Sequence, residues 1–445
     1  MGSSLVELQA AYAAGTHSPE TALAQCLEAI KADNGRLNAF LNVDIDGAQA
    51  AARVSTRRIN DNQARVLEGL PIAVKDNLDV TGLATTAGMA TRRNRLAARD
   101  AGVVARLRAA GAVIVGKLNM TEAALGADGR NPHYGDCHHP HQAGCSPGGS
   151  SSGSATAVAA GLVPAALGTD TMGSVRIPAA YCGVFGLKPS FGLVSTAGSV
   201  AVSRRLDHIG PLAGCLEDLG LLLPVLAGFD PSCPVSRPVL LVEPKQDLIY
   251  GLPELGRVAL ADDVAEPWQA ARQALVNRHF HHRELAGLAM DPGRIRRAGL
   301  LLCEAEMLVE HGPDWAGQRD NFSTELQTLL AWGERRSAPE LAAAVRILDQ
   351  ARLALNAWLE QCDIVILPTT PQRAFSLAQP TPANQADLTC LANCAGLPSL
   401  SMPLPVAANE LPCGLQLIGR HGRDREVLTA AAQLQAILRP ETINR

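Results

Sequence analysis

The sequence lacks both a cluster of like charge and a long apolar run. Its 445 residues carry 39 basic and 43 acidic side chains, a formal net charge of −4, with no acidic or basic block. This excludes the electrostatic footprint of a nucleic-acid-binding or anionic-membrane-binding protein. No stretch reaches the about 18 uninterrupted apolar residues that a membrane helix needs. The closest stretch, 155–167, is interrupted by Gly161 and Pro164.

The sequence also lacks the marks of a secreted protein. Its 11 cysteines are scattered and odd in number, which argues against a disulfide framework and for a reducing compartment. Residues 1–7 contain no basic segment followed by an apolar one, so we expect no signal peptide. Together these observations predict a cytoplasmic protein.

Lysine is scarce: of the 39 basic residues only five are lysines, namely Lys31, Lys75, Lys117, Lys188 and Lys245. Compositional drift toward arginine explains the skew in the simplest way. A sharper hypothesis is that a retained lysine lies where arginine cannot do the same work, because arginine stays protonated in proteins.

Strand and helix signals alternate along the chain, which favours an α/β fold with a central sheet. Ser18, Pro19 and Glu20 form a helix start, and Gly35 is a candidate stop. The short apolar run 70–75 is typical of a buried strand. Residues 246–361 contain amphipathic helices, such as one predicted over 341–359, and no motif.

The Gly/Ser-rich segment 148–155 admits three interpretations. As a phosphate loop it lacks the terminal Gly-Lys-Ser/Thr, and as a flexible linker it is too short. As a nucleophile elbow it would place Ser151 in the G-x-S-x-G position, but the strand that must precede an elbow is missing. The later histidines His208 and His311 have no context that marks them as triad partners.

Three residues at wider spacing form a more informative set. Lys75 ends the run 70–75, Ser150 lies in the Gly/Ser segment, and Ser174 follows 24 positions later in the turn 168–174. A serine hydroxyl needs an adjacent base to become a nucleophile. A buried lysine can serve, because desolvation disfavours its charged form. The set predicts a proton relay without histidine, with backbone N–H groups of the turn facing an oxyanion.

Around these residues the chain resembles the amidase signature family of serine hydrolases. Only residues about 230 to 360 lack a recognisable family motif. The matching segments are 71–77 around the lysine, 116–122, 148–155, 168–178 around the nucleophile, 182–189, 363–371, 395–398 and 414–419. The number and order of these segments make coincidence a poor explanation.

The resemblance implies a role for each relay residue. Ser174 matches the nucleophile that forms an acyl-enzyme, and Ser150 matches the bridging serine, whose bond to Gly149 is typically cis in relatives. Lys75 matches the neutral base that takes the proton of Ser174 through Ser150 and returns it to the leaving amine. Backbone N–H groups over 171–174, namely those of Thr171, Met172, Gly173 and Ser174, match the oxyanion hole.

Three features depart from the family pattern or stay open. Relatives usually carry glycine where this chain has Met172, so we hypothesise that its thioether narrows the substrate pocket; packing into the core is the alternative. Arg176 binds a substrate carboxylate in one interpretation and ties to Asp170 in another. The His- and Cys-rich loop 133–145 matches no ordered metal-ligand spacing, so we expect it to line the site without a metal.

We therefore predict an α/β fold: a single large amidase-signature domain, 1–445, with a central mixed, twisted β-sheet covered by helices on both faces. Within it we expect an N-terminal helical part (1–65), a catalytic core (66–230), a variable helical insertion (231–360) and a C-terminal part that completes the sheet (361–445).

The predicted function is hydrolysis of the C–N bond of a small amide or ureide through an acyl-enzyme, releasing ammonia or an amine, with no metal and no cofactor. The alternative is the glutaminase (A-type) subunit of a glutamine-dependent aminoacyl-tRNA amidotransferase. Met172 and Ile177 argue against it, since such subunits typically have Gly and Gln there. A catalytically silent scaffold is disfavoured because all three catalytic positions are present. We expect a small-molecule amide as partner, no nucleic acid and no membrane. Because relatives are often homodimers, a homodimer stays open.

Overall fold

The computed structural model describes residues 2–256, 258–278, 280–407 and 409–438. Within them, 11 strands form one mixed sheet in the order β1-β3-β2-β4-β6-β5-β10-β11-β9-β7-β8. The strands are β1 Phe40–Val43, β2 Pro71–Lys75, β3 Val113–Leu118, β4 Ala165–Asp170, β5 Phe185–Lys188, β6 His208–Ala213, β7 Tyr250–Pro253, β8 His282–Leu285, β9 Ile364–Pro368, β10 Ser399–Pro403 and β11 Gly414–Gly419. β2 is parallel to β3 and β4, and β7 to β8 and β9, while the remaining pairs are antiparallel.

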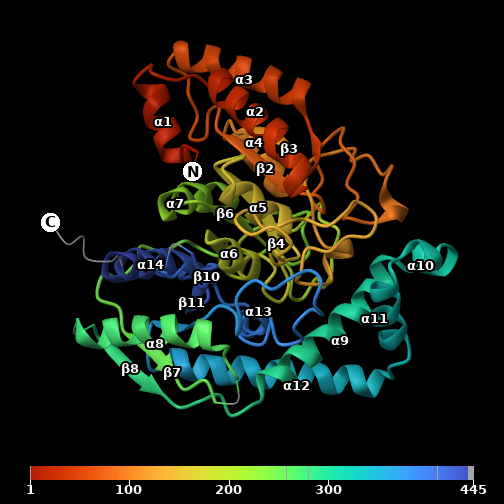
Figure 1. The fold of residues 1–445 in the computed structure, drawn as a ribbon, viewed down its shortest axis with the longest axis vertical. Coiled ribbons are helices and arrows are strands. Elements are labelled where there is room, and N and C mark those ends of the chain that lie inside the picture. The colour runs from red at the N-terminus through yellow and green to blue at the C-terminus, as the bar shows by residue number, and fades with distance from the viewer. Residues whose placement is uncertain (1, 257, 279, 408, 439–445) are drawn as a thin grey trace.

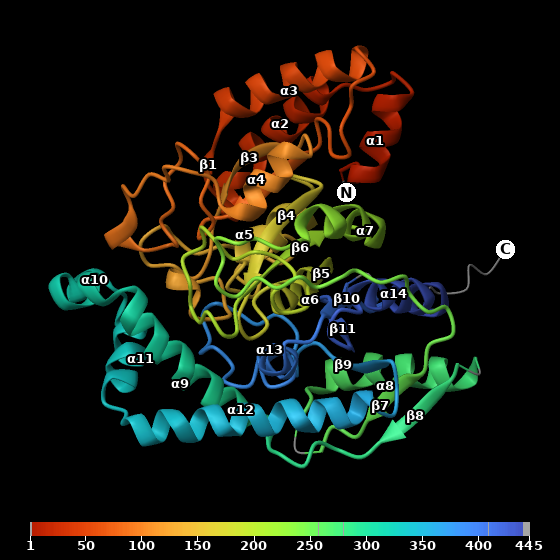
Figure 2. The same ribbon diagram turned by 180° about the vertical axis from the view of Figure 1, so that it is seen from behind.

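Helices pack on both faces of this sheet. They are α1 Leu5–Ala13, α2 Pro19–Leu37, α3 Ile45–Asn60, α4 Gly102–Ala109, α5 Ser152–Ala159, α6 Arg176–Cys182, α7 Leu216–Leu226, α8 Asp262–Asn277, α9 Pro292–Glu310, α10 Gly312–Gly317, α11 Thr324–Glu334, α12 Ala338–Leu359, α13 Cys390–Ala395 and α14 Asp424–Leu438. Three short 3-10 turns, η1 Ala90–Arg92, η2 Glu122–Ala124 and η3 Arg319–Asn321, complete the described elements. Figures 1 and 2 show α1–α3 at one end of the molecule and α8 and α12 at the other.

Successive side chains along a strand pack in separate apolar cores, because they point to opposite faces of the sheet. In β9, Ile364 and Ile366 pack in the core that contains α1, α4, α7 and α14. Val365 and Leu367 point the other way, into the core that contains α9, α11, α12 and α13. The predicted α/β fold, with helices on both faces of a mixed sheet, is thereby confirmed.

Two local predictions differ from the structure. Helix α2 starts as predicted, with the Ser18 side chain capping the amide of Thr21, but it continues past Gly35 to Leu37. It ends there because Asn38 adopts a left-handed conformation (φ 47°), which asparagine tolerates better than most residues. The motif-poor segment 246–361, predicted as helical, also contributes β7 and β8. These strands are only four residues long and show no clear alternation of apolar and polar residues, so periodicity does not reveal them.

Candidate active site

Lys75 is the last residue of β2, which lies between β3 and β4 in parallel pairing. Its side chain is fully buried, and Nζ donates to Ser150 Oγ at 2.7 Å and to Thr169 Oγ1 at 2.8 Å. Burial lowers the pKa of Lys75 to about 7, although the charges of Asp170 and Asp207 act in the opposite direction. Much of this amine is therefore neutral at pH 7 and able to accept a proton.

Ser150 is presented by the Gly/Ser-rich loop that precedes α5. The Gly149–Ser150 peptide bond is cis, as the family resemblance implies. Gly149 leaves no room for a side chain, because an added Cβ would lie 2.8 Å from Thr121 Oγ1 and 3.0 Å from the amide nitrogen of Asp128. This close approach holds the loop against the 121–129 segment and keeps the Ser150 hydroxyl fully buried beside Lys75.

Ser174 lies in the turn between β4 and α6. The Asp170 carboxylate holds this turn by accepting from the amide of Gly173 at 2.8 Å and from the amide that follows Ser174 at 3.1 Å. The amide of Ser151 donates to the Ser174 carbonyl oxygen at 3.2 Å, which joins the turn to the loop that carries Ser150. The structure thus brings the three predicted relay residues into one site, and of the two serines only Ser174 is partly exposed.

The turn also determines which amides are free to face an oxyanion. Because the amide of Gly173 is engaged by Asp170, Gly173 drops out of the predicted donor set. In the part of the chain that the structure describes, the amides of Thr171, Met172 and Ser174 donate to no other group. Met172 does not adopt a positive φ, so the side chain at this position introduces no left-handed strain. Three backbone donors of the predicted set remain in the turn that carries Ser174.

Arg176, the first residue of α6, is fully buried. Its guanidinium pairs with Asp170 through two contacts of 3.0 Å. It also donates to Gln416 Oε1 at 2.5 Å and to Asn393 Oδ1 at 2.6 Å. The prediction that Arg176 binds a substrate carboxylate is wrong for this geometry, because its donors are used inside the protein. The alternative, a tie to Asp170, is the arrangement found.

Thr169 is a site residue that the sequence did not reveal. Its hydroxyl accepts from Lys75 Nζ and, at 3.2 Å, from Asn77 Nδ2. Asn77 in turn donates to the carbonyl oxygen of Val200 at 3.3 Å, which secures the neighbouring loop. The available signal was the position of Thr169 in β4, directly beside the lysine strand. Thr169 thus gives the Lys75 amine a second hydroxyl partner besides Ser150.

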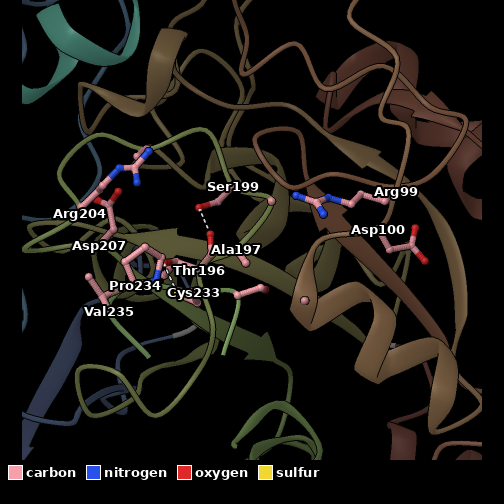
Figure 3. A pocket seen from close by; sticks show the side chains of 14 residues that line it. Arg99, Asp100, Thr196, Ala197, Ser199, Arg204, Asp207, Cys233, Pro234 and Val235 are labelled. Atoms are coloured by element: carbon pink, nitrogen blue, oxygen red, sulfur yellow. Dashed lines mark hydrogen bonds between the residues drawn. The ribbon is translucent and has the colours of Figure 1, made fainter. Parts of the chain in front are cut away.

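Asp207 holds the 171–174 turn through the side chain of Thr171. Its carboxylate accepts from Thr171 Oγ1 at 2.6 Å and from the amides of residues 202–203 at 2.9 and 3.1 Å. Burial raises the pKa of Asp207 to about 6. Figure 3 shows Asp207 beside Arg204 on one side of a cavity of about 360 Å³, with Arg99 across from them. The lining of this cavity includes Asp207 but none of the three predicted relay residues, Lys75, Ser150 and Ser174.

The His- and Cys-rich loop 133–145 spreads its side chains over separate contacts. His133 Nε2 lies 2.8 Å from Glu122 Oε1, and His139 Nε2 lies 2.8 Å from the carbonyl oxygen of Tyr181. Burial lowers the pKa of His139 to about 4. Among the residues that the structure describes, no group of three or more His, Cys, Asp or Glu side chains is arranged to hold a metal ion.

Comparison with known proteins places this geometry in a family. A family model described as Amidase matches residues 21–292 and 315–428. The chain belongs to this amidase family. The match includes Lys75, Ser150 and Ser174, and it identifies the chain as an amidase-type hydrolase that acts on C–N bonds.

Individual relatives of this amidase match over nearly the whole chain. The A-type subunit of the glutamyl-tRNA(Gln) amidotransferase of Anaeromyxobacter sp. (strain K) is 38% identical over 98% of this chain and 96% of its own length. A solved amidase structure has a TM-score of 0.89 and 32% identity, covering 98% of this chain and all of its own. An inhibitor-bound structure from a vestigial complex, linked to the origins of an s-triazine catabolic enzyme, has a TM-score of 0.90 and 31% identity, covering 98% of each chain.

The location and assembly of this family member rest on the sequence. None of the helices in the described residues combines the length and apolar content that crossing a bilayer requires. A cytoplasmic location, a homodimeric state and the division of the chain at residues 65, 230 and 360 stay predictions.

Proposed function

We propose that the chain hydrolyses the C–N bond of a small amide or ureide through an acyl-enzyme on Ser174, with Ser150 and Lys75 as the proton relay. The observation that carries this proposal is the environment of Lys75. Its fully buried amine donates to two hydroxyl groups, and no carboxylate among the described residues pairs with it. Such an amine is a base near neutral pH. One of its partners, Ser150, precedes Ser151, whose amide donates to the Ser174 carbonyl oxygen at 3.2 Å.

The chemistry follows from this arrangement in two half-reactions. Neutral Lys75 takes the proton of Ser150 as Ser150 takes that of Ser174, and Ser174 Oγ attacks the carbonyl carbon. The free amides of the 171–174 turn stabilise the oxyanion that forms, and removing one such donor typically costs about 2.7–4 kcal/mol in the transition state. The protonated relay then gives the proton to the leaving nitrogen. In the second half-reaction water, deprotonated by the same relay, releases the acid from Ser174.

A second candidate is the glutaminase subunit of a glutamine-dependent amidotransferase. It is favoured by the 38% identity, over nearly the full length of both chains, to the A-type subunit of a glutamyl-tRNA(Gln) amidotransferase. Met172 and Ile177 argue against it. In that case the protein would co-purify with partner subunits and hydrolyse glutamine mainly within the complex, whereas the first proposal expects turnover by the chain alone, as a monomer or a homodimer.

The test measures ammonia release by the purified protein from a panel of primary amides, ureides and glutamine, with Ser174→Ala as the control. We expect turnover of at least one small amide or ureide that Ser174→Ala lacks. A fluorophosphonate probe, which reacts with activated serines, is expected to label wild type and not the variant. Absence of both labelling and turnover in folded protein would contradict the proposal. Turnover of glutamine alone, in the presence of partner subunits, would favour the second candidate.

A further inference from the structure

Met172 is held from two sides in the oxyanion turn. Its carbonyl oxygen accepts from Thr389 Oγ1, next to α13, at 2.7 Å, while its amide stays without a partner among the described residues. Its side chain is only 8% exposed and belongs to the apolar core that also contains α9 residues such as Ala298 and Leu302. The residue that offers an amide to the oxyanion therefore extends its thioether toward α9.

The Met172 thioether contacts α9 at Gly299. A Cβ built on Gly299 would lie 3.1 Å from Met172 Cε, 3.3 Å from Met172 Sδ and 4.0 Å from Leu348 Cδ2 of α12. Glycine inside a helix costs about 1 kcal/mol relative to alanine, so its presence in the middle of α9 needs a reason. Contact with the thioether supplies one: Met172 occupies the space that a side chain on residue 299 would fill.

We propose that Met172, seated at Gly299, is the wall that limits the size of the acyl group accepted by Ser174. The inference rests on the proposed function. A carbonyl under attack by Ser174 has its oxygen at the free amides of the turn, so its acyl substituent lies within a few ångströms of residue 172. The Met172 side chain takes up room between the turn and α9 that a longer substituent would need. The substrates it selects are amides or ureides with a short acyl part.

The contact between Met172 and Gly299 can be changed from either residue. This distinguishes a pocket wall from a methionine that only packs in the core. Removing the thioether with Met172→Gly opens the space toward α9. Adding a methyl with Gly299→Ala pushes the flexible thioether away from α9 by a few tenths of an ångström. The two substitutions therefore change acyl-length selectivity in opposite directions. In the double variant the added methyl has no thioether to displace.

The experiment measures kcat/KM for acetamide, butyramide and hexanamide with wild type, Met172→Gly, Gly299→Ala and the double variant. One methylene in an apolar pocket changes kcat/KM by about 10- to 200-fold, so we expect Met172→Gly to raise the hexanamide-to-acetamide ratio by at least about tenfold. Gly299→Ala is expected to lower that ratio, and the double variant to behave like Met172→Gly. The matched control is Gly220→Ala in α7, where an added Cβ meets nothing within 4 Å and the ratio should stay unchanged.

The outcomes separate this inference from the function on which it rests. Turnover that depends on Ser174, combined with equal ratios in wild type and Met172→Gly, overturns the inference and leaves the proposed function intact. If no amide shows turnover that depends on Ser174, the labelling rates of short- and long-chain alkyl fluorophosphonates provide the same ratio; equal ratios across the four proteins overturn the inference. Should Met172→Gly fail to fold, an unchanged ratio in folded Gly299→Ala overturns it as well.

Discussion

Lys75 and Lys188 end two strands of the same sheet, and both are fully buried. Burial lowers the pKa of each to about 7. Their contacts differ. Lys75 Nζ donates to the hydroxyls of Ser150 and Thr169, whereas Lys188 Nζ donates to the carbonyl oxygen of Pro189 at 3.1 Å. A carbonyl oxygen has no proton to give, so only Lys75 can act as a base toward its partner.

The difference teaches that a lowered pKa is not enough to identify a catalytic lysine. Burial is the largest cause at both positions, and at Lys188 the nearby Arg176 charge lowers the pKa further. A third buried lysine, Lys117, shows another outcome, since its Nζ pairs with Asp76 at 2.9 Å. The use of each amine is set by its partner: a hydroxyl relay, a carbonyl oxygen or a carboxylate.

Replacing Lys75 gives the largest effect and tests the comparison most directly. Lys75→Arg keeps a positive charge but cannot accept a proton at neutral pH, so we expect kcat to fall by about 10²- to 10⁴-fold, the range of general acid–base catalysis. Steady-state kinetics on the best amide of the panel provides the measurement.

The matched control is Lys188→Met, which should keep kcat within a few fold. Circular dichroism and thermal unfolding identify a variant that loses activity by failing to fold, and Lys75→Met covers the case in which the larger guanidinium disrupts the core. Substantial turnover by folded Lys75→Arg would refute Lys75 as the base. The functional distinction between Lys75 and Lys188 would then be lost.

The two hydroxyl partners of Lys75 are expected to differ in importance. Ser150→Ala breaks the path to Ser174 and should lower kcat by about 10²-fold or more. Thr169→Val removes only a contact that orients the amine, so a drop of about tenfold is expected, with Thr169→Ser restoring most of it. Equal losses in Ser150→Ala and Thr169→Val, measured as kcat on one substrate, would mean that neither hydroxyl is a special route for the proton.

The sequence was sufficient to predict the residues of the proposed relay and insufficient to predict the side chains that hold them in place. Lys75, Ser150 and Ser174 lie in segments where residue type and spacing carry the chemistry, and alternating strand and helix signals predict the α/β fold. Thr169 was not predicted, because an isolated threonine in a strand has no distinguishing pattern. Its role depends on which strand lies beside β2, and pairing between distant strands is set by tertiary packing.

Arg176 was noticed in the sequence, but its partner could not be predicted. An arginine two positions after a nucleophile fits a substrate carboxylate as well as it fits Asp170. The decision depends on whether the guanidinium points inward, where Gln416 and Asn393 come from segments more than 200 residues away. Gly173 is similar, because the partner of a backbone amide in a turn is determined by the folded loop and not by residue type.

The pH dependence of catalysis sharpens the comparison further. Lys75 must be neutral to accept a proton, and its pKa is lowered to about 7. We therefore expect kcat/KM to fall tenfold per pH unit below about pH 7 and to level off above it. The profile is measured between pH 5 and 9 on a neutral amide, whose own ionisation does not interfere.

Two variants show which groups set this midpoint. The charge of Asp207 raises the pKa of Lys75, so Asp207→Asn should move the midpoint to lower pH. Lys188→Met should leave it in place, because Lys188 makes no contact with the relay. If the midpoint shifts in Lys188→Met and not in Asp207→Asn, the kcat/KM profile reports the titration of Lys188 and not that of Lys75.

The smallest effect on activity, and the clearest on stability, is expected from Lys188→Met. The folded-state pKa of Lys188, about 7, lies below the value of about 10.4 in an unfolded chain. Between these values the unfolded chain binds more protons, so the contribution of Lys188 disfavours folding at pH 7 and is relieved as the pH rises toward 10. Lys188→Met removes this contribution. Its gain in unfolding free energy should therefore be larger at pH 7 than at pH 9, by roughly 2 kcal/mol.

Urea unfolding of wild type and Lys188→Met at both pH values provides the measurement. Titration of the buried cysteines affects both proteins equally and cancels in the difference, so the remaining pH dependence belongs to residue 188. A difference that is the same at pH 7 and pH 9 would mean that Lys188 stays charged in the folded protein. Lys188 would then be held as a cation by Asp170 and Asp424, whose charges raise its pKa, and the two strand ends would differ in charge as well as in their partners.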